Sequence, residues 1–506
     1  MEYIIVQAGG KGTRLGYLTK NKPKALVPVE NLPMLFHLFR KYPDKRFIII
    51  ADYHKEVLRE YLSAFAKVKY LVVDAEGSGT CAGIKRAAEQ IPEGQPFMLV
   101  WSDLVLPQDF RLPKEYEDGK EAQSDYIGIS ATFPCRWSYV DGKFQEEPSW
   151  DHGVAGLFLF TDKSKIGHIP ESGELVRWMQ QEKMEYTEIS LAGTKEFGLL
   201  EEYRKLGREK CRPFNRIRTD GKILVKEAVD EQGKKLAERE CAWYEEVRRR
   251  AAWENGKGCL PRIYGVNPLR MEHIKGKNIY DCALDYQEKL RVLQKLVGAL
   301  QDLHQLGTVQ ADPFSMKEAY YRKTMERLSK IEDLLPFARE REITVNGKKC
   351  RNIYFHKQKL EKRLEQLSCD RFCFIHGDCT FSNLMIRENG SPVLIDPRGY
   401  FGSTKFYGDV RYDWAKLYYS IVGNYDRFNL KEFQLNITAQ EVQLEVASNH
   451  WEDMERDFFA LTGAKEWEIR LLHAVIWLSL TTYAWQDYDS ICGAFYNGLF
   501  YLEDVL

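Results

Sequence analysis

The first two hundred residues of the chain alternate short apolar runs with segments of helical length. The apolar runs, interpreted as strands, are Tyr3–Val6, Phe47–Ala51, Tyr70–Val73, Phe97–Trp101, Tyr126–Thr132 and Gly156–Phe160. The segments between the early runs, interpreted as helices, are Leu32–Tyr42, His54–Phe65 and Ala82–Gln90. Alternation at this spacing is typical of a mostly parallel sheet covered by helices on both faces. We therefore expect an α/β domain in this part of the chain.

A charged stretch, Glu201–Arg212, separates two parts of the chain that differ in pattern. At 506 residues the chain is long enough for several domains. We expect one domain over residues 1–208, followed by a segment over 209–276 and a mostly helical segment over 277–506. The strands expected after the boundary are Arg216–Arg218, Ile223–Lys226, Pro261–Tyr264 and a hairpin at Leu384–Ile395 that turns at Asn389–Gly390. This pattern predicts an α+β fold with a helical C-terminal region.

The charge balance and the cysteines limit the kinds of partner and environment. The chain has 73 Lys and Arg against 74 Asp and Glu, a formal net charge of −1, so nothing in its overall charge predicts a nucleic-acid partner. The 11 cysteines do not follow the spacing of a zinc site, and scattered thiols are typical of the reducing cytosol. Because the chain has neither 18 consecutive apolar residues nor a leader-like start, we expect a cytoplasmic protein without membrane insertion.

A glycine-rich segment, Ala8–Gly9–Gly10–Lys11–Gly12–Thr13, directly follows the first expected strand. Glycines at such a turn let the main chain approach a phosphate or a base closely. Further along, Lys24 lies in an apolar run, where a buried ammonium group requires an anionic partner. Each feature also has a plain structural interpretation: a tight strand-to-helix turn for the glycines, and a surface position at the end of a strand for the lysine.

Taken together, residues 9–29 resemble the opening GGxGTRLxxxTxxxPKxLxPV of the nucleotidyltransferases that join a nucleoside triphosphate to a sugar phosphate or phosphocholine. The resemblance implies a Rossmann-like α/β nucleotidyltransferase domain with a mostly parallel mixed sheet. It implies that Arg14 and Lys24 act on the phosphates as catalytic residues. The residues that it implies for nucleotide binding are Ala8, Gly9, Gly10, Gly12, Thr13, Gly79 and Thr80.

The same resemblance makes Asp103 a magnesium ligand. This residue follows the strand Phe97–Trp101, and carboxylates at the C-terminal ends of parallel strands lie in the crevice where such sheets bind ligands. Mg²⁺ prefers one or two carboxylates together with phosphate oxygens. The family usually supplies a second acidic ligand near the end of the domain. Glu188 and Glu196 are both candidates for it, and the sequence does not choose between them.

A second set of polar residues lies far downstream, in a catalytic loop expected over 376–396. Asp378, Asn383 and Asp396 provide the three groups that phosphoryl transfer requires: an acid that orients the attacking hydroxyl and two oxygen ligands for Mg²⁺. Any one of them alone is usually a turn residue. Their joint spacing, with a strand before the loop and a hairpin inside it, favours a kinase site.

Upstream of this loop, an apolar strand ends in Lys226, and Glu240 follows in a helix. A strand lysine paired with a helix glutamate is how kinases hold the nucleotide phosphates. Glu272 and Ile274 lie in an extended segment that is interpreted as the hinge for an adenine. Residues 213–506 therefore resemble the choline kinase and aminoglycoside phosphotransferase family. That resemblance implies a bilobal protein-kinase-like fold that uses ATP and Mg²⁺, although the loop expected to cover the nucleotide has one glycine instead of several.

The acceptor pocket is expected in the helical C-terminal region. The aromatic residues there could form a cage for a quaternary ammonium group, although aromatic residues at helical spacing are ordinarily core. They are Trp451, Trp467, Trp477, Tyr483, Trp485 and Tyr488.

The two resemblances predict a bifunctional enzyme. It would phosphorylate a small hydroxyl-bearing molecule (a choline-like amino alcohol, a sugar or a polyol) with ATP. It would then couple the product to CMP from CTP, release pyrophosphate, and serve capsule or surface-glycan synthesis. One alternative is a sugar kinase joined to a sugar-1-phosphate guanylyl- or uridylyltransferase. Another is a small-molecule kinase with a non-catalytic, nucleotide-sensing N-terminal domain. Its partners would be the acceptor and nucleoside triphosphates, and the sequence leaves the oligomeric state open.

Overall fold

The computed structural model describes residues 1–117, 122–205, 215–228, 231–250 and 259–506. The chain divides into two compact units. Unit 1 comprises Met1–Glu209 and Trp485–Asp489, and unit 2 comprises Lys210–Ala484 and Ser490–Leu506. The domain boundary expected at residue 208 lies outside the described residues.

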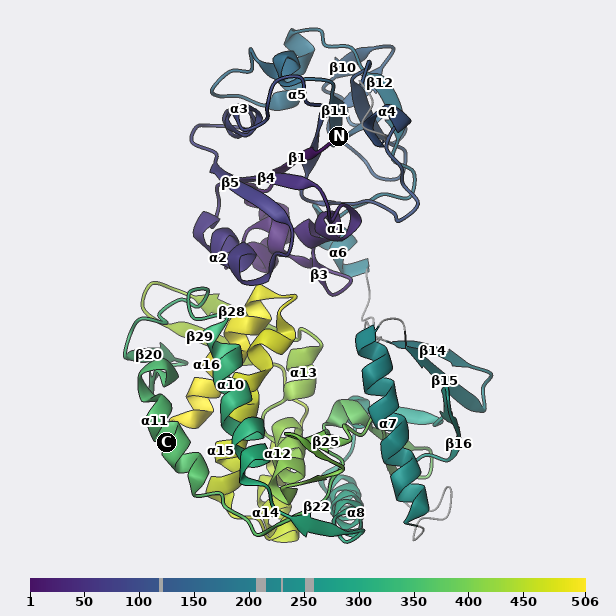
Figure 1. Cartoon of the computed structure of the whole chain (residues 1–506), viewed down its shortest axis with the longest axis vertical. Helices are drawn as coiled ribbons and strands as arrows, with labels where there is room; N and C mark the ends of the chain where they lie inside the picture. Colours follow the sequence, from purple (N-terminus) through teal and green to yellow (C-terminus); the bar gives the residue numbers. More distant parts are fainter. Residues whose placement is uncertain (118–121, 206–214, 229–230, 251–258) are drawn as a thin grey trace. The chain divides into compact units, whose positions relative to one another are not determined.

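Unit 1 is built on a nine-stranded mixed sheet. Its strands are β1 (Tyr3–Gln7), β4 (Arg46–Ala51), β5 (Lys69–Asp74), β6 (Phe97–Trp101), β8 (Tyr126–Ser130), β9 (Ser138–Val140), β10 (Lys143–Gln145), β11 (Gly153–Phe160) and β12 (Thr187–Ser190). β1 runs parallel to both of its neighbours, β4 and β6, and β5 continues the parallel set beyond β4 (Figure 1). β11 pairs antiparallel with β6. This sheet confirms the expected α/β fold class.

Helices pack on both faces of this sheet because β4 is apolar on both sides. The helices are α1 (Met34–Lys41), α2 (Lys55–Phe65), α3 (Cys81–Glu89) and α5 (Leu175–Gln181). On one face, the ring centroid of Phe47 lies 4.7 Å from that of Phe39 in α1. On the other face, Ile48 and Ile50 join the buried cluster that contains Ile84 of α3. Alternate residues of a strand point to opposite faces, so a run of apolar residues can serve both.

The first part of unit 2 is a four-stranded sheet with one long helix. The strands, in their order across the sheet, are β14 (Asn215–Thr219), β15 (Ile223–Ala228), β17 (Leu269–Glu272) and β16 (Ile263–Val266). Neighbouring strands pair antiparallel. The helix α7 (Glu231–Arg249) packs against β15 and β16 (Figure 1).

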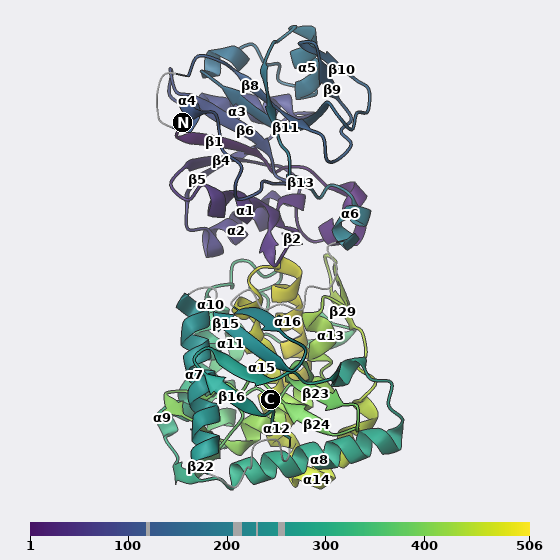
Figure 2. The ribbon, with the colours of Figure 1, turned by 90° about the vertical axis from the view of Figure 1, so that its right-hand side faces the viewer.

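The rest of unit 2 is mostly helical. Its main helices are α8 (Tyr286–His304), α9 (Pro313–Lys317), α10 (Lys323–Ser329), α11 (Ile353–Glu365), α12 (Val410–Ile421), α13 (Tyr425–Asn429), α14 (Glu455–Thr462), α15 (Glu466–Leu480) and α16 (Tyr488–Leu502). A capping box between Asp285 and Glu288 starts α8, which packs against β22 (Arg371–Phe374) and β24 (Pro392–Leu394) (Figure 2). The expected hairpin is β23 (Leu384–Arg387) with β24.

In this helical region, strands were expected only around the catalytic loop, and the structure contains others. A four-stranded sheet is present, made of β21 (Lys348–Arg351), β20 (Glu342–Val345), β29 (Val442–Val446) and β28 (Phe433–Ile437) in that order. Asn346 and Gly347 form the turn between β20 and β21, and both have positive φ. The expectation that these residues are helical was therefore wrong. The Asn-Gly pair and the alternation of apolar and polar residues in β29 are strand signals that the sequence already contains.

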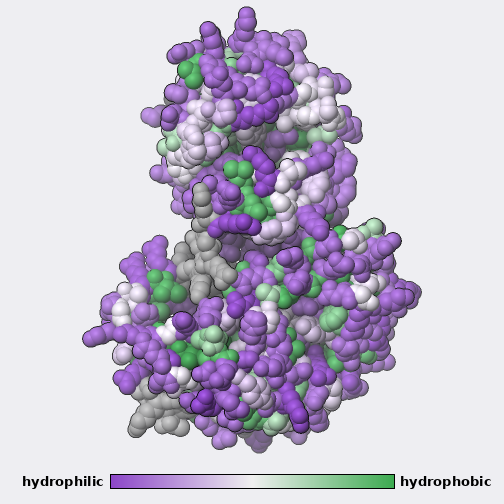
Figure 3. Space-filling model, turned by 180° about the vertical axis from the view of Figure 1, so that it is seen from behind, coloured by the Kyte–Doolittle hydropathy of each residue, from purple (hydrophilic) through white to green (hydrophobic). Residues whose placement is uncertain are grey.

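None of the described helices has the length and apolar composition that crossing a membrane requires. On the face drawn in Figure 3, hydrophilic side chains cover most of the surface and hydrophobic ones occur in small groups.

Candidate functional site

The glycine segment of unit 1 packs directly against Lys24. Gly12 has φ +61°, and a Cβ atom at this position would lie 3.0 Å from Cβ of Lys24 and 3.0 Å from Cγ2 of Thr19. A Cβ at Gly9 would lie 2.8 Å from Cβ of Asp52, whereas one at Gly10 would meet no protein atom within 4 Å. The glycines at 9 and 12 are therefore required by the fold itself, while Gly10 leaves open space at an exposed position.

Lys24 pairs with two acidic residues that come from elsewhere in unit 1. Its Nζ donates to Oδ2 of Asp103 and lies 3.9 Å from Oε1 of Glu196. Burial disfavours the charged form of Asp103, but the Lys24 ammonium outweighs it and keeps the pKa of Asp103 below its usual value. Burial, and then the charge of Asp103, raise the pKa of Glu196 to about 7. Below neutral pH, Glu196 is therefore the carboxyl group that carries a proton, while Asp103 stays ionised.

The structure distinguishes the two candidates for a second acid. Glu196 lies on β13 (Lys195–Glu196), which pairs antiparallel with β7 (Leu104–Val105) next to Asp103. Glu188 lies on β12, in the main sheet, and its side chain is exposed. Oδ1 of Asp103 is buried and has no hydrogen-bond partner within the described residues. An unpaired buried carboxylate oxygen beside a second carboxyl group fits a divalent cation, so Asp103 and Glu196 could hold Mg²⁺.

The other residues predicted for nucleotide binding in unit 1 lie in two segments. Thr13 and Arg14 are exposed at the end of the glycine segment, and Ala8 is buried where β1 ends. Gly79 has φ +86° and lies so close to the main chain of Gly173 that no Cβ would fit. The Thr80 hydroxyl accepts a hydrogen bond of 2.8 Å from the N–H of Leu175, so it helps to shape this loop.

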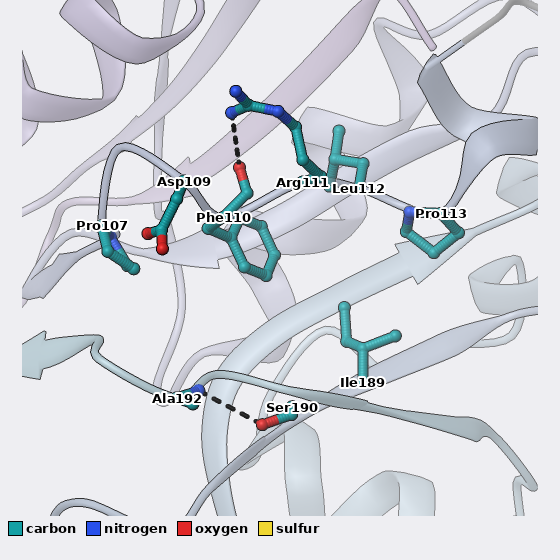
Figure 4. A pocket seen from close by; sticks show the side chains of 9 residues that line it. All are labelled: Pro107, Asp109, Phe110, Arg111, Leu112, Pro113, Ile189, Ser190 and Ala192. Carbon is teal, nitrogen blue, oxygen red and sulfur yellow. Dashed lines mark hydrogen bonds between the residues drawn. The ribbon is translucent and has the colours of Figure 1, made fainter.

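A pocket of about 470 Å³ lies elsewhere in unit 1 (Figure 4). Its walls are the segment 107–113 and three residues at the end of β12 and just beyond it, Ile189, Ser190 and Ala192. The residues predicted from the sequence to bind nucleotide or metal are not among those that line it. The candidate site of unit 1 therefore consists of Lys24, Asp103 and Glu196 and does not include this pocket.

In unit 2, Lys226 of β15 bridges two carboxylates. Its Nζ lies 2.6 Å from Oε2 of Glu240 in α7 and 2.6 Å from Oδ1 of Asp396. Burial and the neighbouring Asp396 outweigh the Lys226 ammonium and raise the pKa of Glu240 to about 7. Asp396 has φ +57°, a strained conformation for a residue with a side chain. Such strain is typical of residues held in place for a function.

The loop before Asp396 brings Asp378 and Asn383 together. Nδ2 of Asn383 donates to the carbonyl oxygen of Asp378 at 2.8 Å and to its Oδ2 at 3.1 Å. Lys416 of α12 lies with its Nζ 3.0 Å from Oδ1 of Asp378. Lys416 was not predicted from the sequence, although it follows the acidic residue Asp413 by one helical turn in α12. Asp396 and Asn383 offer carboxylate and amide oxygens, which are ligands that Mg²⁺ takes.

Asp413 holds this loop in place from α12. It is fully buried, and its carboxylate accepts hydrogen bonds from the N–H of His376 at 2.9 Å and of Gly377 at 2.7 Å. Nε2 of His304, at the end of α8, lies 3.1 Å from the same carboxylate. Asp413 of α12, itself held by His304 of α8, thus fixes the main chain just before Asp378, which limits the positions that its side chain can take.

The expected hinge follows β17. The Glu272 carboxylate is held by the Arg387 guanidinium, with a distance of 2.9 Å between Nη2 and Oε2. Ile274, two residues later, is buried. Two of the aromatic residues considered for a cage belong to the core instead. Trp451 and Trp477 are core residues with 1% and 0% exposure, packed against Phe381 and Tyr419.

Two protein families match the chain, one within each unit. Residues 4–114 match the family described as MobA-like NTP transferase domain, and residues 219–437 match the Phosphotransferase enzyme family. The chain joins an NTP transferase domain to a phosphotransferase domain. Lys24 and Asp103 lie within the first matched range, and Lys226, Asp378 and Asp396 lie within the second. These matches confirm the resemblances expected from the two motifs.

Several curated proteins are similar to part of the chain. Glucose-1-phosphate cytidylyltransferase of Salmonella typhimurium is 27% identical over 215 residues, which cover 36% of this chain and 82% of that protein. Mannose-1-phosphate guanyltransferase of Yarrowia lipolytica is 28% identical over 145 residues, covering 27% of this chain and 40% of that protein. Among solved structures, HddC from Yersinia pseudotuberculosis has a TM-score of 0.35 and 18% identity, and covers 41% of this chain and 98% of that chain.

Proposed function

We propose that the protein is a bifunctional enzyme that phosphorylates a small hydroxyl-bearing acceptor and then activates the product as a nucleotide conjugate. The observation that carries this proposal is that each domain has its own lysine bridging two carboxyl groups. These are Lys24 with Asp103 and Glu196, and Lys226 with Glu240 and Asp396. Because each domain has its own lysine and pair of carboxyl groups, the two domains would catalyse two separate reactions. The acceptor classes expected from the sequence are an amino alcohol, a sugar or a polyol.

In the phosphotransferase domain, we assign Asp378 as the residue that orients the acceptor hydroxyl and takes its proton. The hydroxyl oxygen forms a bond to the γ-phosphorus of ATP, the bond from that phosphorus to the bridging oxygen breaks, and ADP leaves. Lys226, held by Glu240, would bind the nucleotide phosphates, with the adenine against the Glu272–Ile274 segment. Asn383 and Asp396 would hold Mg²⁺, which neutralises charge on the phosphates when it is bound.

In the transferase domain, the new phosphomonoester is the nucleophile. One of its oxygens attacks the α-phosphorus of a nucleoside triphosphate, and pyrophosphate leaves with the electrons of the broken bond. Lys24 and Arg14 would stabilise the charge on the phosphates, the segments around Gly10 and Gly79 would hold the nucleotide, and Asp103 with Glu196 would hold Mg²⁺. The presence of Glu196 beside Asp103 supports a catalytic domain over a nucleotide sensor.

We propose CTP as the nucleotide, supported by the cytidylyltransferase that is 27% identical over 215 residues. The guanyltransferase relative favours GTP as the second candidate. We place the product in the synthesis of capsule or other surface glycans, as expected from the sequence, in a protein of the cytoplasm.

A pyrophosphate-release assay tests this assignment. The purified chain is incubated with ATP and a panel of acceptors, and then with each of the four nucleoside triphosphates. We expect pyrophosphate release that requires both ATP and an acceptor, with CTP as the preferred second nucleotide. Release with GTP or UTP alone would favour the guanylyl- or uridylyltransferase alternative. Acceptor phosphorylation with no pyrophosphate release from any nucleotide would favour the sensor alternative.

A further inference from the structure

Four basic side chains lie near Asp378 and close enough to act on one another electrostatically: Lys323 and Arg327 of α10, Arg398, and Lys416 of α12. Lys323 and Arg327 are four residues apart and therefore lie on one face of their helix. A π-helical segment (Glu318–Arg322) directly precedes Lys323, and such segments are frequent at functional sites. All four side chains are partly exposed, so a ligand can reach them.

Contacts fix Arg398 and Lys416 beside the catalytic loop. The N–H of Arg398 donates to the carbonyl oxygen of His376 at 2.8 Å, and its Nη1 lies 2.9 Å from the hydroxyl of Tyr412. Nζ of Lys416 lies 5.8 Å from the centroid of the same tyrosine ring and 3.0 Å from Oδ1 of Asp378. Two cations therefore lie next to the proposed catalytic carboxylate.

Arg327 is held in position by contacts with neutral groups. Its Nη1 lies 3.0 Å from Oγ of Ser479 in α15, and its guanidinium lies 5.8 Å from the centroid of the Tyr483 ring. Within the described part of the chain, no carboxylate lies within 4.0 Å of the charged groups of Lys323, Arg327 or Arg398. These three basic groups therefore make no direct ion pair among the described residues, although the charge of Asp378 acts on Lys323 and Arg398 from further away.

The pKa shifts of residues in the basic cluster, which consists of Lys323, Arg327, Arg398 and Lys416, and of the neighbouring Tyr400 agree with this geometry. The positive charge of Arg398 and then burial, with Arg327 and Lys416 adding to the effect and Asp378 opposing it, lower the pKa of Lys323 to about 5. The Lys323 amine is therefore largely uncharged near pH 7 in the free protein, and a bound anion would favour its protonated form. Burial disfavours ionisation of Tyr400, yet the charge of Arg398 lowers the pKa of its hydroxyl below the usual value. Three permanent or paired cations, Arg327, Arg398 and Lys416, thus lie near one carboxylate, Asp378, and their excess positive charge favours a bound anion.

We propose that the acceptor of the phosphotransferase domain is an anion. Besides the hydroxyl that is phosphorylated, it carries a carboxylate or phosphate group, which Lys323, Arg327 and Arg398 bind beside Asp378. This inference rests on the proposed kinase function and narrows its substrate class. It excludes a choline-like amino alcohol, because a cation would be repelled by the cluster, and it selects acidic derivatives of a sugar or polyol.

Matched acceptors test the proposal with the full-length chain, ATP and Mg²⁺. One series is glycerol, glycerate and glycerol phosphate; a second is glucose, glucuronate and glucose 6-phosphate; choline is the cationic member. We expect kcat/KM for an anionic member to exceed that of its neutral counterpart by about tenfold or more, as charge-assisted contacts imply. Comparison of the carboxylate-bearing with the phosphate-bearing acceptors identifies which anionic group the site prefers. Preferred phosphorylation of choline or of a neutral member would overturn the proposal while leaving the kinase assignment intact.

Substitutions of Lys323 and Arg327 test whether these residues cause the preference for an anionic acceptor. Lys323→Met and Arg327→Met should each raise KM for the anionic acceptor about tenfold and leave KM for ATP unchanged. Lys330→Met is the matched control, because Lys330 follows the same helix, is exposed and pairs with Glu326 at 2.8 Å. An increase in KM for ATP alone would show that the cluster serves the nucleotide and would contradict the proposal.

A binding measurement tests whether Lys323 and Arg327 bind an anion, even if no acceptor in the panel is phosphorylated. Sulfate is titrated into the full-length chain in the presence of Mg²⁺ and a non-hydrolysable ATP analogue, and thermal unfolding is followed. We expect a saturable rise in Tm for the wild type and for Lys330→Met that is lost in Lys323→Met and Arg327→Met. An equal rise in all four proteins would mean that the cluster binds no anion. Absence of kinase activity with this pattern retained would count against the proposed function only.

Discussion

Glu196 faces Asp103 although the two residues are far apart in the sequence. The pairing of β13 with β7 sets Glu196 opposite Leu104, and the N–H of Phe197 donates to the carbonyl oxygen of Asp103 at 3.2 Å. The Lys24 ammonium lies between the two carboxyl groups. A short antiparallel pair outside the main sheet therefore completes the acidic site, and this relationship leads to the first prediction.

Glu196→Gln should reduce pyrophosphate release by at least about tenfold, because it removes one of two carboxylates from the proposed Mg²⁺ site. Since the pKa of Glu196 is raised to about 7, a proton occupies this carboxyl group below neutral pH and competes with the metal. The apparent Mg²⁺ affinity of the transferase should therefore increase as pH rises through about 7. Glu188→Gln is the matched control, and it should keep both the activity and the pH dependence of the wild type. A wild-type pH profile in Glu196→Gln would remove this residue from the site.

Gly12→Ala should lower stability by about 1 kcal/mol or more, because alanine is strained at positive φ. It should also weaken nucleotide binding in the transferase domain, since the added Cβ would lie 3.0 Å from Cβ of Lys24. Gly10→Ala meets no protein atom within 4 Å and should leave the stability unchanged, so any loss of binding there reports on the ligand. Calorimetric titrations with CTP, GTP and UTP measure binding, and ATP affinity of the phosphotransferase domain serves as the internal control. Unaltered binding in Gly12→Ala would exclude the loop from the nucleotide site.

Asp378→Asn and Asp396→Asn should each abolish ATP-dependent phosphorylation. The first removes the group that takes the hydroxyl proton, and the second removes a proposed metal ligand; such residues contribute orders of magnitude to turnover. Both substitutions conserve size, so circular dichroism and Tm should show a folded protein. If Asp378→Asn kept a tenth of the wild-type rate, the role assigned to Asp378 would be wrong.

The two reactions should be separable, because each domain holds its own lysine and carboxylates. Lys24→Ala should stop pyrophosphate release while the phosphorylated acceptor accumulates. Asp378→Asn should block the free acceptor but still convert an acceptor phosphorylated beforehand. A mixture of the two variants should restore the overall reaction, measured as the nucleotide conjugate, since the intermediate can diffuse between molecules. Loss of kinase activity in Lys24→Ala would contradict two independent sites.

Much of the site could be predicted locally. The glycine segment with Lys24, and the spacing of Asp378, Asn383 and Asp396, place chemically matched groups around single loops, so their proximity follows from a few turns of the chain. The Asn389–Gly390 hairpin was predicted for the same reason. The equivalent signal at Asn346–Gly347 was overlooked, because the surrounding residues were assigned to a helical region.

Strand and helix periodicity and the loop motifs are local properties, so the fold class and the two transferase domains could be predicted from the sequence. The choice of Glu196 over Glu188, and the positions of Lys416, Lys323, Arg327 and Arg398 near Asp378, became known from the three-dimensional structure. Those arrangements depend on pairing and packing between segments distant in the chain. Periodicity shows which face of an element is buried, but the partner on that face is set by the competition among all elements for the same core.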